Sequence, residues 1–192
     1  MNMVGRLIIL FILSAYREKV HPGNATSLLN FRVGFLDLDF NFHINNGKIV
    51  TLFDLGKLDL LTKCGMIKPQ ITGEFQSVIK ENICTYPRSA GYGQRVEMEG
   101  HILRWDEKHI VIRQRLYKKP KVYSGIRSKL FKKTKNTKAE KSLVAEITST
   151  CAFRQGRKVL KPSDAFFKAR GIQIEAVGEW SGTHEFIAET AD

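Results

Sequence analysis

The stretch from Asp37 to Gly65, "DLDFNFHINNGKIVTLFDLGKLDLLTKCG", decides the fold that we expect for this chain. Residues 46–64 follow the period of an α-helix, about 3.6 residues per turn. One helix face carries residues at spacings of four, three and four: Ile49, Phe53, Gly56 and Leu60. Apolar side chains also lie on the other sides: Val50, Leu55, Leu58 and Leu61. A helix that is apolar on most sides is buried on most sides, so we expect it at the centre of the domain.

The ends and the middle of this helix carry residues with special roles. Asn45 and Asn46 are good N-cap residues, and at least one of them is expected to cap the helix. Gly56 allows a neighbouring backbone to approach closely, because glycine has no side chain. The pair Cys64-Gly65 supplies a C-terminal stop.

The chain on both sides of this helix alternates apolar and polar residues, which is the pattern of β-strands. The expected strands are residues 30–35, 74–85, 95–105, 109–117 and 143–154. The short polar turn "DEK" at 106–108 indicates a hairpin. The segment "PSDAFFKARG" predicts a short helix, with Ser163 or Asp164 as its N-cap and Gly171 as its stop.

This order of elements predicts an α+β hotdog fold, in which a curved antiparallel sheet wraps one long central helix. The 192 residues suit one domain of ordinary size. We expect an apolar helix over residues 1–20, a hotdog domain over 30–171 with a basic insertion at about 118–141, and a tail over 172–192. An open sheet leaves strand edges, and pairing two protomers edge to edge covers them, so a dimer is expected.

The cysteines argue against two kinds of stabilising site. Cys64, Cys84 and Cys151 are widely spaced and odd in number, and the sequence contains no CxxC motif or Cys/His cluster. Neither a disulfide framework nor a zinc site is therefore supported. We expect buried, reduced thiols in a cytoplasmic protein that uses no metal and no cofactor.

The N-terminal segment "MNMVGRLIILFILSAYREK" contains an apolar run from Leu7 to Leu13 after Arg6. This run is too short for a membrane span, which needs about 20 apolar residues. It suits a docking or membrane-surface helix, which would make the protein peripheral to a membrane. A cleaved signal peptide is the alternative, although Leu13-Ser14-Ala15 gives only half of a cleavage motif.

The basic insertion holds most of the positive charge of the chain. Ten Lys or Arg and a single acid, Glu140, lie between Lys118 and Lys141, which gives this segment +9 of the total +12. Three partners fit such a charge: the phosphates of CoA, an anionic lipid surface or nucleic acid. Nucleic acid is disfavoured, because no recognised domain signature accompanies the charge. A solvated hairpin without a partner is the remaining alternative.

One motif resembles a known family. The string Asp-x-Asp-x-x-x-His-x-Asn-Asn resembles hotdog thioesterases of the 4-hydroxybenzoyl-CoA thioesterase-like superfamily, and it is formed by Asp37, Asp39, His43, Asn45 and Asn46. "GHILRWDEKHIVIRQRLY" and "VAEITSTCAFRQGRKV" resemble later strand pairs of the same branch. The resemblance covers residues 31–171 apart from the basic segment. It implies an acyl-CoA thioesterase, which hydrolyses an acyl-CoA or another acyl thioester. It also implies a homodimer or a dimer of dimers, with sites between protomers.

The resemblance also implies a catalytic carboxylate at Asp39. A loop anchor is the alternative role, although six residues before Asn45 is too far for direct capping of the helix. Asp37 would face the opposite way if the strand continued, so a structural role is expected for it. Related sequences often have Gly where this chain has Phe42, and Tyr where it has Ile49. These departures concern the shape of the pocket and the substrate more than the reaction type.

Thioester hydrolysis needs a nucleophile or base and donors for the developing oxyanion. The helix N-terminus offers free N–H groups and a partial positive charge. We therefore expect the backbone around Asn45, Asn46, Gly47 and Lys48 to polarise the thioester carbonyl. His43 is expected either to orient the carboxylate or substrate, or to be a hydrogen-bonded loop residue.

Asp54 is the alternative carboxylate, since some hotdog enzymes use an acid from this helix. Lys57 lies three residues further on, and an ordinary ion pair between the two is the favoured interpretation. Asp59 and Lys63 form a second expected pair.

Two other functions stay open. A non-catalytic protein that binds acyl thioesters or lipids would keep the outline of the site without the reaction. A hotdog dehydratase would use a pair such as His43 and Asp39 to move protons at a β-hydroxyacyl thioester.

Overall fold

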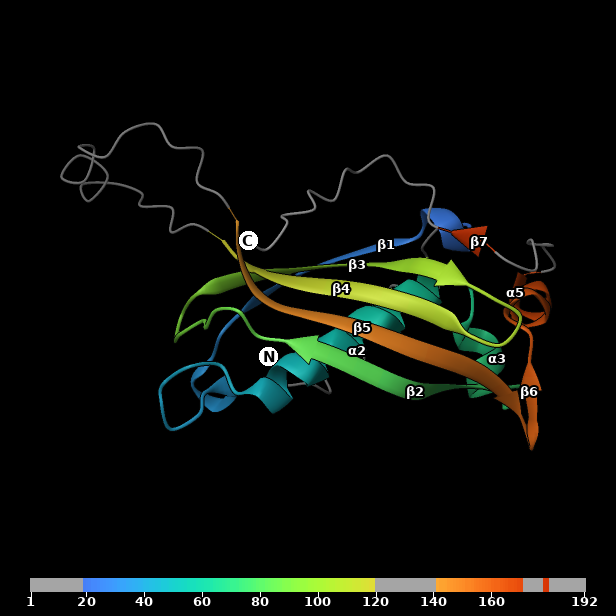
Figure 1. Ribbon diagram of the computed structural model, residues 1–192, viewed down its shortest axis with the longest axis horizontal. Helices are drawn as coiled ribbons and strands as arrows, with labels where there is room; N and C mark the ends of the chain where they lie inside the picture. Colours follow the sequence, from blue (N-terminus) through green and yellow to red (C-terminus); the bar gives the residue numbers. More distant parts are fainter. Residues whose placement is uncertain (1–18, 120–140, 171–177, 180–192) are drawn as a thin grey trace.

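The computed structural model describes residues 19–119, 141–170 and 178–179, and in these residues an antiparallel sheet curves around a long helix (Figure 1). The strands are β1 (Thr26–Arg32), β2 (Gln76–Thr85), β3 (Arg95–Trp105), β4 (Ile110–Lys118), β5 (Ser142–Gln155), β6 (Lys158–Leu160) and β7 (Gly178–Glu179). The helices are α2 (Asn46–Lys63), α3 (Ile67–Ile71) and α5 (Pro162–Arg170), with 3-10 turns η1 (Pro22–Asn24) and η2 (Phe35–Asp37). The strand order is β1-β3-β4-β5-β2, with β6 beside β5 and β7 beside β3. The predicted hotdog architecture is confirmed.

The central helix α2 begins and ends as its sequence indicates. Asn45 is the N-cap, and its Oδ1 accepts a hydrogen bond from the Gly47 N–H at 2.8 Å. Cys64 is the C-cap, and Gly65 has a φ of +76°, the left-handed conformation in which glycine commonly ends a helix. The predictions for both helix ends are confirmed.

Side chains of α2 fill the core along the whole helix. Its first half packs in one cluster with the sheet: Ile49, Leu52, Phe53, Leu55, Met98, Leu116, Ala145 and Ile147. Its second half packs in another, which α5 also joins: Leu60, Leu61, Phe75, Trp105, Ile112, Phe153 and Phe166. The prediction that this helix is buried on most sides is confirmed.

The sheet packs tightly against α2 at Gly56, but it does so through side chains, whereas the sequence predicted a close backbone. A Cβ at this position would overlap Gln114 Nε2 and would lie 2.5 Å from the Met98 methyl carbon. Gln114 is fully buried, and its Nε2 donates a hydrogen bond to the Phe53 carbonyl at 2.9 Å. The Gln114 side chain therefore reaches from the sheet to a carbonyl group of the helix backbone. Only glycine at position 56 leaves space for this side chain.

Gly56→Ala is expected to lower the free energy of unfolding by about 1–3 kcal/mol, the usual cost of overpacking a core. The gain in helix propensity, about 1 kcal/mol in an exposed helix, does not offset the displaced Gln114 and its hydrogen bond. Urea unfolding followed by circular dichroism measures the change. Unchanged or increased stability would show that the contact is loose.

The first strand differs from its prediction. It spans Thr26–Arg32, whereas the alternating pattern predicted residues 30–35. The Asp37 carboxylate accepts a hydrogen bond from the Gly34 N–H at 2.9 Å, which closes the 3-10 turn η2 and takes the chain out of the sheet. Phe35 is consequently exposed instead of alternating into the core.

The short elements that were not predicted include α3, β6 and β7. Helix α3 has five residues, too few to show a helical period. Strand β6 pairs with β5 through a tight turn at Gly156, whose φ is +58°. The other strand predictions agree with the structure to within two residues at each end. Helix α5 confirms the C-terminal helix, but it begins at Pro162, so Ser163 and Asp164 lie inside the helix and neither is its N-cap.

Several predictions concern residues outside those that the structure describes. They are the N-terminal apolar helix, most of the basic insertion, the stop at Gly171 and most of the C-terminal tail. Among the described helices, none is long and apolar enough to cross a membrane. The cysteines are free thiols, with Cys64 and Cys151 buried and Cys84 partly buried.

Candidate functional site

The loop between β1 and α2 carries the motif residues, and Asp39 organises its tip. Leu38 and Ile44 form an antiparallel bridge, and the Asp39 N–H donates to the His43 carbonyl at 2.8 Å. The carboxylate Oδ1 of Asp39 accepts hydrogen bonds from the backbone N–H groups of Asn41, at 2.9 Å, and His43, at 3.1 Å. The second oxygen, Oδ2, accepts none within the described part of the chain. Asp39 is thus held in one orientation with one oxygen unengaged.

Asp37 has the structural role that the sequence suggested. Its carboxylate closes the turn at Gly34, and its carbonyl accepts the Asn45 N–H at 2.8 Å. Both ends of this residue therefore fix the path of the loop into α2.

The N-terminus of α2 offers backbone donors close to the loop in sequence. The Asn45 side chain engages the Gly47 N–H, and the Ile49 N–H donates to the Asn45 carbonyl. Of the four expected backbone positions, Asn46 and Lys48 keep N–H groups that form no hydrogen bond among the described residues. These two N–H groups also lie at the positive end of the helix dipole, where a negative charge is stabilised.

His43 is placed by its backbone. It forms a bridge with Gly91 in the loop before β3, and its N–H is one of the two donors to Asp39. Its imidazole is exposed, and no hydrogen bond of the described residues joins it to the Asp39 carboxylate.

Phe42 adopts a backbone conformation that favours glycine. Its φ is +58°, and it is the one described residue other than glycine with a positive φ. A bulky side chain in this region is strained, whereas glycine adopts the conformation freely. Its side chain is 71% exposed.

The alternative carboxylate, Asp54, forms the expected ion pair. Its Oδ1 lies 2.9 Å from Lys57 Nζ, with the Asp54 side chain half-exposed and that of Lys57 buried. Lys57 Nζ also donates to Ser149 Oγ at 3.3 Å, and Ser149 Oγ donates to Asn82 Oδ1 at 2.6 Å. This polar chain joins α2, β5 and β2, and Ser149 and Asn82 had no sequence signal that linked them to the helix. The second expected pair, Asp59 with Lys63, is also present at 3.2 Å.

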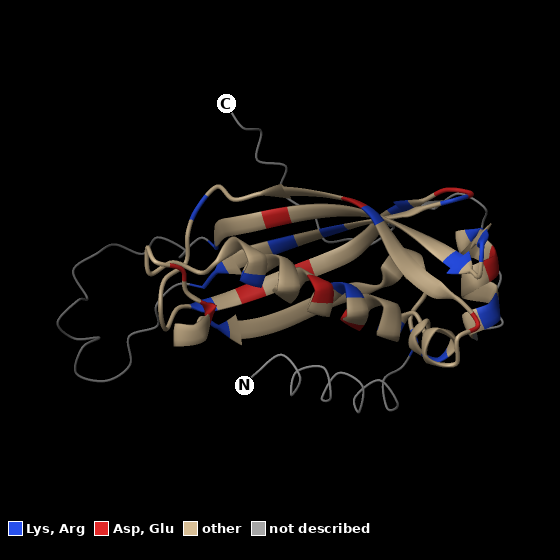
Figure 2. Cartoon of the chain, turned by 90° about the horizontal axis from the view of Figure 1, so that it is seen from below, with Lys and Arg blue, Asp and Glu red and all other residues tan. Residues whose placement is uncertain are grey.

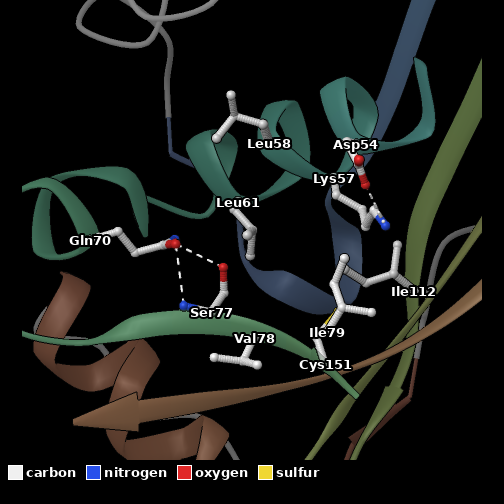
Figure 3. A pocket seen from close by; sticks show the side chains of 10 residues that line it. All are labelled: Asp54, Lys57, Leu58, Leu61, Gln70, Ser77, Val78, Ile79, Ile112 and Cys151. Atoms are coloured by element: carbon white, nitrogen blue, oxygen red, sulfur yellow. Dashed lines mark hydrogen bonds and ion pairs between the residues drawn. The ribbon is translucent and has the colours of Figure 1, made fainter. Parts of the chain in front are cut away.

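A cavity lies between α2 and β2, with the ion pair at its side (Figure 3). Its volume is about 160 Å³. Side chains from α2, α3 and three strands line it: Asp54, Lys57, Leu58, Leu61, Gln70, Ser77, Val78, Ile79, Ile112 and Cys151. Burial raises the pKa of the Cys151 thiol to about 11, so this thiol stays protonated near neutral pH and is no nucleophile. The cavity can hold an apolar group with polar contacts at one side.

A sequence model of the thioesterase-like superfamily matches residues 33–169. Protein THEM6 of Danio rerio is 27% identical over 104 residues, 54% of this chain and 52% of that protein, so the chain spans about half the length of this relative.

Solved structures with a similar fold include three named as thioesterases. The probable thioesterase YbaW of Escherichia coli has a TM-score of 0.58 at 14% identity, over 74% of this chain and 95% of that one. The 4-hydroxybenzoyl-CoA thioesterase of Pseudomonas sp. strain CBS-3 has a TM-score of 0.58 at 14% identity, over 76% and 99%. The DHNA-CoA thioesterase of Staphylococcus aureus has a TM-score of 0.56 at 15% identity, over 76% and 91%. At such identities these similarities show the hotdog fold.

Proposed function

This chain belongs to the thioesterase-like superfamily, and from that premise we propose that it hydrolyses acyl thioesters, acyl-CoA among them, to a free acid and a thiol. The observation that carries this proposal is the position of Asp39. Two backbone N–H groups hold its carboxylate in a turn directly before a helix that begins with unengaged N–H groups.

The reaction follows from these groups. Asp39 Oδ2 attacks the thioester carbonyl carbon or removes a proton from a water molecule that attacks it. The carbonyl oxygen gains negative charge and accepts hydrogen bonds from the N–H groups of Asn46 and Lys48. The C–S bond then breaks, and the thiolate leaves and takes up a proton. An acyl-aspartate, if formed, is hydrolysed by water.

The cavity beside the middle of α2 is the proposed place for the acyl group. Its apolar walls include Leu61, Val78 and Ile112. Asp54, at the cavity, is eight residues beyond Asn46, which corresponds to about 12 Å along a helix. An acyl group of medium length that extends from the helix N-terminus along α2 reaches this cavity.

Dimerisation through β2 is part of the proposal. In the described sheet β2 has β5 on one side only, and its apolar residues Val78, Ile79 and Ile83 are exposed. A second copy that pairs with this edge would satisfy its backbone and cover these side chains. The carboxylate and the oxyanion donors then come either from one protomer or from two.

Thiol release from a panel of acyl-CoA thioesters, of short to long chains and with aryl groups, tests the function. We expect release of free CoA thiol that saturates with substrate, with the highest kcat/KM for groups that fit the cavity. No thiol release from any member, with a folded protein, would contradict the proposal.

A second candidate is a protein that binds acyl thioesters without hydrolysis. It is favoured by the engagement of Asp39 Oδ1 and of the Gly47 N–H in local hydrogen bonds. Calorimetric titration with acyl-CoA distinguishes the two functions, because this candidate predicts saturable binding with no thiol released.

A further inference from the structure

Five large apolar side chains project into solvent from the loop end of the domain. They are Phe35, Leu36, Phe40, Phe42 and Tyr92, which we call the loop patch. Phe40 is fully exposed, and each of the other four is at least 69% exposed. Exposed apolar side chains that gather on one part of a surface mark an interaction site.

The loop patch comes from two loops that are fastened together. The loop before α2 and the loop before β3 are joined by the bridge between His43 and Gly91 and by a hydrogen bond from the Ile44 N–H to the Ala90 carbonyl at 2.7 Å. Both loops lie at the same end of the sheet (Figure 1). The five side chains therefore belong to one end of the domain.

The five side chains of the loop patch do not serve the hydrophobic core, because other residues of the same loops are the ones buried in it. Val33, Ile44 and Ala90 are buried in the cluster around the first half of α2. Three smaller side chains thus point inward, and Leu36 and the four aromatic rings point outward. This is the reverse of the usual preference of large apolar side chains for the interior.

Phe42 adds a second, independent observation. It holds a left-handed backbone conformation that is strained for a bulky residue. Packing within the domain does not offset the strain, because the ring is largely exposed. A contact outside the domain is the physical role that remains for this ring.

Three basic side chains lie beside the part of the loop patch that the loop before β3 supplies. Arg32 Nε donates to the Gly93 carbonyl at 3.2 Å, next to Tyr92. Lys118 Nζ donates to the Ser89 carbonyl at 3.1 Å, and Arg88 Nη1 donates to Ser142 Oγ at 3.4 Å.

These hydrogen bonds leave the three positive charges without an acidic partner among the described residues. The carboxylates of the neighbouring loop, Asp37 and Asp39, accept backbone N–H groups instead. Acidic and basic residues both occur near this end of the domain (Figure 2). The three cations without an acidic partner, and not the net charge of this end, are therefore the groups that can attract an anionic partner.

The basic insertion leaves the domain at the same end. Strand β4 ends at Lys118 and β5 begins at Ser142. Residues 119–141, whose sequence carries +8, therefore join the domain at the end where Lys118 contacts the loop before β3.

We propose that the loop patch docks the protein on a membrane surface that contains anionic lipid. Aromatic and aliphatic side chains enter the boundary between headgroups and acyl chains, and the surrounding cations attract the lipid phosphates and carboxylates. The proposal goes beyond thioester hydrolysis and does not depend on it. It also places the Asp39 loop against the surface in which acyl thioesters dissolve.

Co-sedimentation of the full chain with vesicles tests the proposal. We expect binding to vesicles of phosphatidylcholine with phosphatidylserine, weaker binding to phosphatidylcholine alone, and a decrease with added salt, since surface charge is screened over about 10 Å at 0.1 M. The double variant Leu36→Ser/Phe40→Ser should lower the partition coefficient about tenfold. The charge variant Arg32→Glu/Arg88→Glu should lower it on the anionic vesicles only.

Matched controls make the result decisive. Val159→Ser/Phe167→Ser removes two half-exposed apolar side chains outside the loop patch and should leave binding unchanged. Equal loss in this control, or full binding by Leu36→Ser/Phe40→Ser, would overturn the proposal and assign lipid binding to another part of the chain. A second copy of the chain is the other partner that fits the loop patch, and sedimentation velocity tests it. A change of oligomeric state in Leu36→Ser/Phe40→Ser without a change in vesicle binding would identify the loop patch as a contact between two copies.

Phe42 allows the strain to be separated from the contact. Phe42→Gly and Phe42→Ala both remove the ring and should lower vesicle binding equally, by about threefold. Phe42→Gly should melt a few degrees higher than Phe42→Ala, because glycine tolerates the positive φ. Full binding by both variants would show that the ring makes no lipid contact.

Discussion

Asp39→Asn is expected to lower the rate of thiol release by about 10²–10⁴-fold, the usual contribution of a catalytic base or nucleophile. The amide group has neither the negative charge nor the basicity to attack the thioester or to activate water. Steady-state release of CoA thiol, measured with the acyl-CoA that the wild type hydrolyses fastest, gives the change in kcat.

The structure makes this substitution specific. Asparagine keeps an Oδ1 atom, so the hydrogen bonds from the Asn41 and His43 N–H groups persist and the turn stays formed. Asp37→Asn is the matched control, because it keeps the acceptor for the Gly34 N–H and lies outside the proposed chemistry. The control should keep normal activity, and both variants should melt within a few degrees of the wild type.

Phe53→Ala is expected to lower the free energy of unfolding by about 3–5 kcal/mol. Phe53 is fully buried at the centre of the first core cluster, where α2 meets the sheet, so the deletion leaves a cavity that the neighbours only partly fill. Urea unfolding should show a lower midpoint with an unchanged m-value, since the surface exposed on unfolding stays similar.

Phe40→Ala is the matched control for this loss of stability. It deletes the same side chain at a fully exposed position and should change the free energy of unfolding by about 0.5 kcal/mol or less. A similar large loss in both variants would mean that Phe40 packs against the protein, which would also contradict the loop patch.

The central helix was predictable because its information is local. Its apolar residues repeat over five turns, and its caps, Asn45 and the pair Cys64-Gly65, lie at its ends in the sequence. The alternating strands were predictable for the same reason. The end of β1 was missed because one side-chain hydrogen bond, from the Gly34 N–H to Asp37, outweighs the strand pattern there.

The candidate site was predictable only where its residues are neighbours in the sequence. Asp39, the helix cap and the pair of Asp54 with Lys57 all lie within one continuous segment. The link from Lys57 to Ser149 joins residues 92 positions apart, and no local pattern encodes such a contact. The cavity and the loop patch were missed for a related reason, since each depends on which strands or loops the fold brings together.

Single-turnover thiol release, with the protein in excess over acyl-CoA, tests the central claim most directly, because it reports the chemical step without product release. The proposal predicts that wild type converts all bound acyl-CoA to free thiol, and that Asp39→Asn binds the same acyl-CoA with similar affinity but releases thiol at least about 100-fold more slowly. Equal single-turnover rates in the two folded proteins would contradict the assignment of Asp39 as the reactive carboxylate.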